Sequence, residues 1–441
     1  MKRNDARYAL QQCMPMHTII DSNRSSVMRH PQSLADIVTN GLCIGCGLCE
    51  SMAGPDRVSM VMVDPPGRLR PKILQPLDSS TEQEIIRACP GVTIDQPMDA
   101  RTHPQAEIDT VFGPWINVWR GHASDPYIHH VASSGGALTA LGIYLLESGK
   151  VDFILHVAAS TEQPMRSVRH LSFDRAQVVE ATGSRYGPAA PLVDFKQLLD
   201  RGKRFAVIGK PCDISAVHNM CKLDPRVDDL VAYTLAFSCG TFADLNCSHA
   251  MLHRNGIASE DEVSLFRYRG YGCPGPTHAE TKDGRAVDEA YRDFWYGPWG
   301  WTHQFRCKIC PDPTGEMTDI SVADAWPGGG PSEEEWGGWN LFISRTNKGD
   351  ELMKEAHDKG VLHLETSDIS AIYECQPHQA VKIQGMEARL SAIEQEGQVG
   401  PRFVHLRLSD AAARTDAEFQ NRNREGTRER IKKGVNREPL A

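Results

Sequence analysis

The sequence predicts an α/β protein whose main body is a mostly parallel sheet covered by helices. From about residue 110 to residue 400, short continuous apolar runs alternate with longer segments whose apolar residues have helical spacing. An earlier stretch instead carries closely spaced cysteines. We therefore expect four regions: an irregular lead-in over residues 1–32, a cysteine-rich segment over 33–102, a catalytic domain over 110–400 and a charged tail over 401–441.

The elements of the main body follow one another in strand and helix pairs. Residues 135–149 predict a helix because Leu138, Leu141 and Leu145 recur at helical spacing. Helices are also expected at 213–221 and from about Lys348. The strand candidates are short apolar runs at residues 151–157, 205–208, 230–237, 320–326 and 339–343. Such alternation favours parallel pairing, with helices packed on the sheet.

The composition argues against several classes of protein. The 441 residues are 40% hydrophobic and 24% charged, with a formal net charge of −9. An acidic chain lacks the electrostatic footprint of a dedicated nucleic-acid binder, so no nucleic-acid partner is expected. We find no apolar run long enough for a membrane span and no secretory signal, and expect a cytoplasmic protein. Thirteen unevenly spaced cysteines fit metal chemistry better than a disulfide scaffold.

Three cysteines set two residues apart form the first candidate site. Cys43, Cys46 and Cys49 have the spacing of bacterial ferredoxins, in which one wrapped turn directs three sulfurs at one cluster. The intervening glycines allow the backbone to curl tightly and to aim N–H groups at sulfide. With Cys89 as the fourth ligand, the segment predicts a ferredoxin-like fold with one 4Fe-4S cluster. Structural zinc is the alternative, although it usually appears with paired Cys-x-x-Cys units or histidines.

A second set of cysteines is spread along the main body. Cys307 and Cys310 form an isolated Cys-x-x-Cys, while Cys212 and Cys239 each follow a predicted strand. If these strands are neighbours in a parallel sheet, both cysteines emerge at its carboxyl edge, where open α/β sheets place their ligands. Four thiols would then meet there. The alternative is that Cys212 and Cys239 are small buried side chains without a ligand.

Taken in order, these motifs resemble the beta subunit of the coenzyme F420 hydrogenases and dehydrogenases, a family that includes 8-vinyl reductases and 7-hydroxymethyl chlorophyll a reductase. The resemblance covers about residues 42–403. Besides the cysteines, it rests on Ala-Ser-Ser-Gly-Gly-Ala at 132–137, Thr-Gly-Ser-Arg-Tyr at 182–186, Tyr-Arg-Gly at 268–270 and Asp-Ile-Ser-Val-Ala-Asp-Ala-Trp at 319–326. It implies FAD in the main body, a 4Fe-4S cluster on Cys212, Cys239, Cys307 and Cys310, and electron delivery from a ferredoxin-type donor.

The residues expected to hold the flavin lie in three short motifs. The first motif begins an apolar helix, so its free N–H groups suit a pyrophosphate, although an ordinary serine N-cap explains the same pattern. The other two add guanidinium and phenol groups that hold phosphate or stack on a ring. The candidates are Ser133, Ser134, Gly135, Gly136, Ser184, Arg185, Tyr186, Tyr268 and Arg269.

Three further residues are candidates for catalysis. His129 or His130, where the family pattern more often has basic residues, is expected to donate the proton that accompanies hydride-type transfer; a histidine satisfied in the core is the alternative. Lys210 stands where the family pattern leads us to expect a small or apolar residue. A cation there is expected to raise the potential of a nearby cluster or flavin.

The sequence thus predicts an FAD and iron-sulfur dependent oxidoreductase. Electrons are expected to pass from a ferredoxin-type donor or a redox partner subunit, through 4Fe-4S clusters and FAD, to a small-molecule acceptor. That acceptor is either a deazaflavin or a tetrapyrrole such as divinyl chlorophyllide. The alternatives are an electron-transfer subunit of a larger hydrogenase or dehydrogenase complex with no substrate of its own, and a zinc-stabilised module without redox activity. The sequence is compatible with a homo-oligomer. The Arg-rich tail is expected to be solvated.

Overall fold

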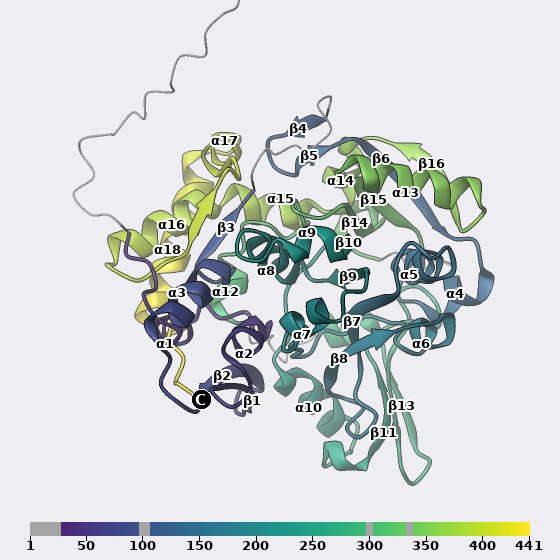
Figure 1. Ribbon diagram of the computed structural model, residues 1–441, viewed down its shortest axis with the longest axis horizontal. Helices are drawn as coiled ribbons and strands as arrows, with labels where there is room; N and C mark the ends of the chain where they lie inside the picture. Colours follow the sequence, from purple (N-terminus) through teal and green to yellow (C-terminus); the bar gives the residue numbers. More distant parts are fainter. Residues whose placement is uncertain (1–27, 97–105, 297–302, 332–337) are drawn as a thin grey trace, which may run out of the picture.

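The computed structural model describes residues 28–96, 106–296, 303–331 and 338–441. Most of the predicted lead-in and the predicted linker at 98–105 lie outside these residues. A central eight-stranded sheet carries helices on both faces, with a cysteine-rich unit on one side and a small antiparallel sheet below it in Figure 1. Within the described residues, no helix combines the length and apolarity needed to cross a membrane.

The central sheet is parallel in its middle and antiparallel at both sides. Strands β14, β10, β9 and β7 pair in parallel, and the outer strands pair antiparallel. In spatial order the strands are β16 (Leu362–Ser367), β6 (Asn117–Ala123), β15 (Asn340–Ser344), β14 (Ile320–Asp324), β10 (Val231–Phe237), β9 (Phe205–Gly209), β7 (Phe153–Ala159) and β8 (Ser167–Ser172). The α/β class is therefore confirmed, and the predicted parallel pairing holds for the four central strands.

Helices cover both faces of this sheet because its apolar residues alternate along each strand. On β14, Val322 packs in the same core cluster as Leu141 and Leu352, while the next residue, Ala323, packs in the cluster on the opposite side. Helices α5 (Ala137–Glu147) and α13 (Asn347–Asp358) lie on the first face. Near the edges of the sheet are α4 (Pro126–Val131) and α6 (Arg175–Glu180), and the other face carries α7 (Phe195–Asp200), α8 (Pro211–Cys221) and α9 (Arg226–Leu230).

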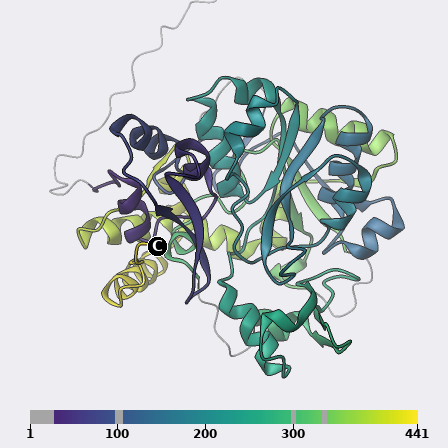
Figure 2. The ribbon, with the colours of Figure 1, turned by 60° about the horizontal axis from the view of Figure 1, so that its bottom comes forward.

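The cysteine-rich segment packs directly on the face that carries α7 and α8, as the purple ribbon of Figure 2 shows. Ile44, Leu48 and Ala88 share one buried cluster with Phe195 and Ile214 of the main body. Its elements are α1 (Leu34–Thr39), α2 (Leu48–Ala53), β1 (Val58–Val63), β2 (Arg68–Ile73), α3 (Ser79–Ala88) and β3 (Thr93–Asp95). The two units therefore share a core.

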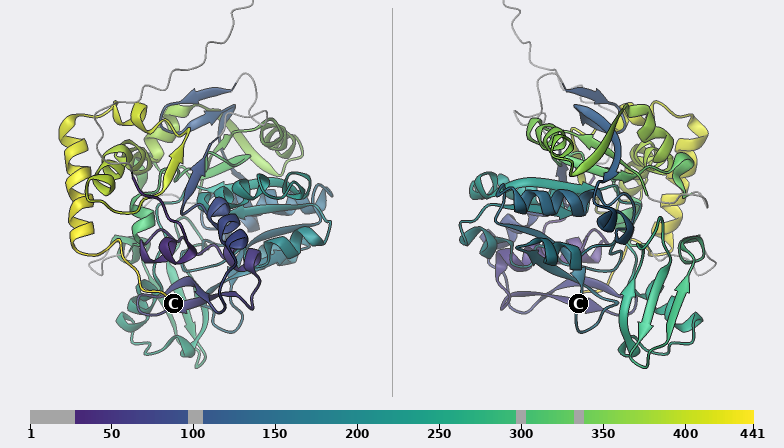
Figure 3. Two further views of the ribbon diagram at one scale, coloured as in Figure 1. Left: turned by 60° about the vertical axis from the view of Figure 1, so that its left-hand side comes forward. Right: turned by 90° about the vertical axis from the view of Figure 1, so that its right-hand side faces the viewer.

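The remaining elements form smaller additions to this frame. Strands β11 (Val263–Arg267), β12 (Thr277–Thr281) and β13 (Ala286–Glu289) make an antiparallel sheet beside α10 (Leu245–Arg254), seen at the lower right of the right-hand view in Figure 3. Short connecting elements are β4 (Glu107–Asp109), β5 (Gly113–Trp115), η1 (Glu260–Glu262), α11 (Tyr291–Tyr296), α12 (Phe305–Lys308) and η2 (Pro327–Gly329). Helices α14 (Ile369–Cys375), α15 (Pro377–Gln384) and α16 (Met386–Gln395) follow β16.

The C-terminal segment is folded, and the charged residues of its Arg-rich part lie mostly at the surface, as expected for a solvated tail. It forms β17 (Arg402–Val404), α17 (Leu408–Ala412) and α18 (Ala417–Lys432), coloured yellow-green to yellow in Figure 3. Strand β17 pairs in parallel with β3, and α18 packs along α16. Some charges outside this Arg-rich part are paired within the fold: Arg407 pairs with the buried Glu316, and Glu438 pairs with Arg68 and Arg70.

Candidate functional site

The first four predicted cysteines lie together around one small apolar cavity. Cys43 and Cys46 lie on the loop before α2, Cys49 on its first turn, and Cys89 at the carboxyl end of α3. The wall between them is completed by Leu34, Ile37, Ile44, Leu48, Met52, Met60, Ile85 and Ala88. The structure therefore brings this predicted set together, away from bulk water.

Two glycines allow the loop to follow this path. Gly45 and Gly47 have φ values of +72° and +86°, a region that favours glycine. A Cβ atom on Gly47 would lie 2.5 Å from Cγ1 of Val193, and one on Gly45 would lie 2.9 Å from the carbonyl oxygen of Leu69. The Gly45 N–H donates to Sγ of Cys43 over 3.4 Å. Both glycines are thus required by backbone conformation and by close packing.

Burial dominates the electrostatics of these thiols. It raises the pKa of each of the four, to about 12 for Cys89, and the neighbouring cysteines raise the pKa of Cys46, Cys49 and Cys89 further. Without a bound cation the thiols therefore keep their protons at neutral pH, whereas iron would stabilise the thiolates. Across the described residues, no three His, Cys, Asp or Glu side chains converge on a point where they could bind a single metal ion.

The second predicted set also lies together, at the carboxyl ends of β9 and β10. Cys212 is in the first turn of α8, Cys239 follows β10, and Cys307 and Cys310 lie in and just after α12. Electrostatic contacts join Cys212 to Cys239 and Cys310, and join Cys239 to Cys307. Burial raises the pKa of Cys239 to about 12 and also raises that of Cys212 and Cys310.

A buried ion pair stands between the two cysteine sets. Nζ of Lys210 donates to Oδ2 of Asp213 over 2.7 Å, and the Asp213 side chain is 1% exposed. The negative charge of Asp213 raises the pKa of both Cys46 and Cys212, one from each set. Burial alone would lower the pKa of Lys210, but Asp213 and the nearby cysteines raise it above its usual value. Lys210 is therefore a paired cation.

A pocket of about 230 Å³ opens beside this ion pair, at the carboxyl ends of the four parallel strands. Gly209, Phe237 and Asp324, the last residues of β9, β10 and β14, line it together with Val157 of β7, and Cys239 belongs both to the pocket and to the second cysteine set. This is the edge at which open α/β sheets bind ligands. The predicted flavin residues that line it are Ser133, Ser134, Gly136, Ser184, Arg185, Tyr186 and Arg269.

The amino end of α5 faces this pocket. Ser133 accepts the N–H of Ser184 over 2.6 Å, and Ser134 donates to the carbonyl of Trp339 over 3.2 Å. The N-cap of α5 is Gly136, with φ of +74° and no side-chain hydrogen bond to the helix, so the alternative of an ordinary serine N-cap is wrong. Leu138 is among the first-turn residues that line the pocket. These N–H groups could receive an anionic ligand.

Two predicted flavin contacts serve packing instead. The Arg185 guanidinium donates to the carbonyl oxygens of Pro164, Met165, Arg166 and Phe266, and so it ties two loops together. Tyr268 is fully buried, and its hydroxyl lies 2.8 Å from Oγ of Ser248. Arg185 lines the pocket, but these hydrogen bonds engage its guanidinium, and Tyr268 does not line the pocket. Both side chains therefore have a structural role in the fold.

Arg269 is a buried charged residue that lines the pocket. It is 3% exposed and donates twice to Asp324, each time over 3.1 Å. Its guanidinium also lies 4.7 Å from the ring centre of Trp326, and its Nη1 donates to the hydroxyl of Tyr186 over 3.3 Å. The aromatic contacts and the carboxylate fix this cation at the pocket wall.

The two histidines predicted as proton donors lie elsewhere. On α4, Nε2 of His129 lies 2.7 Å from the Gly338 carbonyl and its ring stacks on His122, while His130 contacts the ring of Tyr271. Neither lines the pocket. His156 does line it, and the sequence could have indicated it, since it precedes the end of a predicted strand. Burial lowers the pKa of His156 to about 3, so it is neutral at physiological pH.

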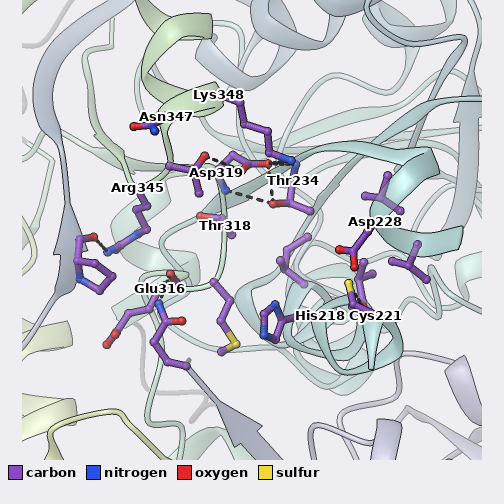
Figure 4. A pocket seen from close by; sticks show the side chains of 18 residues that line it. His218, Cys221, Asp228, Thr234, Glu316, Thr318, Asp319, Arg345, Asn347 and Lys348 are labelled. Carbon is purple, nitrogen blue, oxygen red and sulfur yellow. Dashed lines mark hydrogen bonds and ion pairs between the residues drawn. The ribbon is translucent and has the colours of Figure 1, made fainter. Parts of the chain in front are cut away.

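A larger cavity, of about 460 Å³, lies at the opposite edge of the sheet (Figure 4). Here Asp319 accepts hydrogen bonds from the Thr234 N–H over 2.8 Å and from Oγ1 of Thr346 over 2.7 Å, and Lys348 lies 3.1 Å away. None of the predicted site residues lines this cavity. The predicted residues that line a pocket lie instead at the smaller one, together with Cys239.

Glu316, on the wall of the larger cavity, gives a pH-dependent prediction. It is 2% exposed, and burial raises its pKa from 4.5 to about 7 despite the nearby Arg407 and Arg345. The folded state therefore retains a proton that the unfolded chain releases, and stability falls as the pH rises through this window.

Glu316→Gln should remove this dependence. Relative to the wild type, the variant's unfolding free energy should rise by about 3 kcal/mol between pH 4.5 and 7.5, measured by urea denaturation. Glu418→Gln on exposed α18 is the control and should follow the wild type. A constant difference between Glu316→Gln and the wild type across this range would contradict the assignment.

Two family models match the central part of this chain. Residues 118–196 match the family model described as coenzyme F420 hydrogenase/dehydrogenase, beta subunit N-term, and residues 202–370 match the model of its C terminus. The chain is 25% identical to coenzyme F420 hydrogenase subunit beta of Methanococcus voltae, over 58% of this chain and 86% of the relative. It is 23% identical to coenzyme F420-dependent sulfite reductase of Methanocaldococcus jannaschii, over 75% of this chain and 48% of the relative.

A solved structure has the same fold. It is a chain of the F420-reducing [NiFe] hydrogenase complex from Methanosarcina barkeri. That chain superposes on the present one with a TM-score of 0.50 at 21% sequence identity. The match covers 67% of the present chain and 98% of the other. The structural similarity thus extends across nearly the whole of that chain.

Proposed function

Because this chain belongs to the coenzyme F420 hydrogenase/dehydrogenase beta subunit family, we propose that it is an electron-transfer subunit of an F420-linked oxidoreductase, with two 4Fe-4S clusters and a flavin. Its relatives include subunits of hydrogenase and formate dehydrogenase, so a redox role is common to them. The observation that carries the proposal is spatial: two sets of four cysteines and one pocket follow one another, with Cys239 shared between the second set and the pocket.

The donor sets fit iron-sulfur clusters. Each set offers four thiols, the usual ligands of a 4Fe-4S cluster. Cys43, Cys46, Cys49 and Cys89 would hold one cluster, and Cys212, Cys239, Cys307 and Cys310 the other.

The pocket fits a flavin dinucleotide. The amino end of α5 offers N–H groups to a pyrophosphate, whereas Gly135 packs against Asn340, where a Cβ would lie 2.5 Å from Oδ1, and does not line the pocket. Arg269, held by Asp324, adds a fixed positive charge. A flavin bound there would supply the conversion between one-electron and two-electron transfer. The residues present would bind and orient it beside Cys239.

A deazaflavin is the two-electron acceptor that we propose. The relatives described above are named for coenzyme F420, and none of them is named for a tetrapyrrole. A redox partner subunit would exchange single electrons with the first cysteine set. This proposal combines the electron-transfer role with a site for the acceptor in the same chain.

The test uses the full chain purified without oxygen. We expect about eight irons and eight labile sulfides per chain, with bound flavin. The isolated chain, reduced by a viologen, should then reduce a deazaflavin but not divinyl chlorophyllide. Zinc in place of iron, or absence of flavin, would overturn the proposed cofactors; reduction of the tetrapyrrole, or of neither compound, would overturn the proposed acceptor.

A further inference from the structure

A buried arginine lies between the two cysteine sets. Arg70, on β2, is 1% exposed, and it is not one of the predicted site residues. Its Nη1 donates to the carbonyl of Leu69 over 2.8 Å, its Nη2 donates to Oε1 of Gln304 over 2.9 Å, and its Nε donates to Oε2 of Glu438 over 2.5 Å. A cation removed from water in this way acts over a longer range than one at the surface.

Arg70 reaches both cysteine sets. Its Nη1 is 3.6 Å from the position that a Cβ on Gly45 would occupy, in the loop between Cys43 and Cys46. On the other side, the amide of Gln304, which accepts from Arg70, donates through Nε2 to Sγ of Cys307 over 3.4 Å. The charge of Arg70 acts directly on the first set. It acts on the second set through the side-chain amide of Gln304.

The counter-charge comes from the end of the chain. Glu438 lies 368 residues from Arg70 in sequence, and its side chain is 8% exposed. It also pairs with Arg68 over 2.7 Å, and Arg68 pairs with the fully buried Asp244 over 2.6 Å. The four side chains carry two positive and two negative charges, so the network is neutral as a whole. Removing one member leaves a net charge beside the cysteines.

The backbone around Glu438 is fixed against the first cysteine set. The Glu438 N–H donates to the carbonyl of Thr39 over 3.3 Å. Asn436 is 2% exposed, and a Cβ on Gly41 would lie 3.1 Å from its carbonyl oxygen. The C-terminal segment therefore closes over the loop that carries Cys43. It lies outside residues 118–370, which span the two family models.

From this arrangement we propose that Arg70 and Glu438 act as an opposed charge pair that sets the reduction potentials of the two cysteine-held centres, with the larger effect on the first. The inference rests on the proposed function, since it requires clusters at both sets. Adding an electron to a cluster increases its negative charge, so a nearby cation stabilises the reduced form and a nearby anion destabilises it. Both residues are positioning residues, because they act through charge and do not hold the cluster.

Substitutions by a neutral polar residue separate this role from simple packing. Arg70→Gln should lower the midpoint potential of the first centre, and Glu438→Gln should raise it, because the two changes remove opposite charges. At a fixed ambient potential, each should change the ratio of reduced to oxidised first centre by about tenfold, equivalent to ~59 mV for one electron. The double variant should return toward the wild-type value. The measurement is a redox titration of the anoxic protein followed by electron paramagnetic resonance.

Controls keep the outcomes distinct. Arg422→Gln breaks an exposed ion pair on α18 and should leave both potentials unchanged. If a single variant loses iron, the charge-neutral double variant and Arg70→Lys provide the comparison. Shifts in the same direction, or none, in proteins that retain both centres would overturn this inference alone. A wild-type protein without iron would instead overturn the proposed function.

Discussion

Cys49→Ser is expected to remove about half of the bound iron, roughly four atoms per chain, while flavin content stays at the wild-type level. Cys49 belongs to the first cysteine set, and none of the four cysteines of that set lines the pocket. Its loss should therefore remove the first cluster without disturbing the flavin. Reduction of the flavin by a protein partner should fall more than a hundredfold, because the first centre is the proposed entry point for electrons.

Cys310→Ser tests the second set in the same way. It should also remove about half of the iron, but it should leave the characteristic signal of the first centre. Iron, labile sulfide and flavin per chain, together with electron paramagnetic resonance of the reduced protein, measure both variants. Cys221→Ser, on the far end of α8 and in neither set, is the matched control and should retain all cofactors. Loss of all iron from Cys49→Ser would indicate a single shared centre instead of two.

The cysteines could be predicted from the sequence because their signals are local. Cys43, Cys46 and Cys49 lie within seven residues, and Cys212 and Cys239 follow apolar runs that are identifiable as strands. Parallel neighbours then place the latter two at one edge, and the pairing of β9 with β10 confirms that step. Such positions depend on spacing and on strand ends, which a single sequence displays.

Side-chain partners from distant segments could not be predicted. Arg185 looked like a phosphate contact, but its acceptors are backbone carbonyls of residues 164–166 and of Phe266, which no local pattern reveals. The tertiary pairing of Arg407 could not be predicted either, because its partner, Glu316, lies far away in sequence. Charge paired through tertiary contacts is indistinguishable in sequence from charge exposed to water.

Gly240→Val is expected to weaken flavin binding roughly 5- to 150-fold without loss of iron. Gly240 lines the pocket, and a Cβ built on it meets no atom within 4 Å, so the new side chain would occupy open pocket space. Its φ does not lie in the left-handed region that favours glycine, so the backbone accepts valine. The added atoms would collide with a bound ligand, and such overpacking typically costs 1–3 kcal/mol, roughly 5- to 150-fold in affinity.

The matched control is Gly330→Val, since a Cβ there also meets nothing within 4 Å and Gly330 does not line the pocket. Both variants, stripped of flavin and titrated with FAD by fluorescence, should have wild-type melting temperatures and wild-type iron, and only Gly240→Val should bind FAD more weakly. Retained iron matters because Gly240 adjoins Cys239, and loss of the second centre would weaken binding for a different reason. Equal FAD affinity in Gly240→Val and the wild type would place the flavin outside this pocket and would leave the cysteine sets without an adjacent two-electron site.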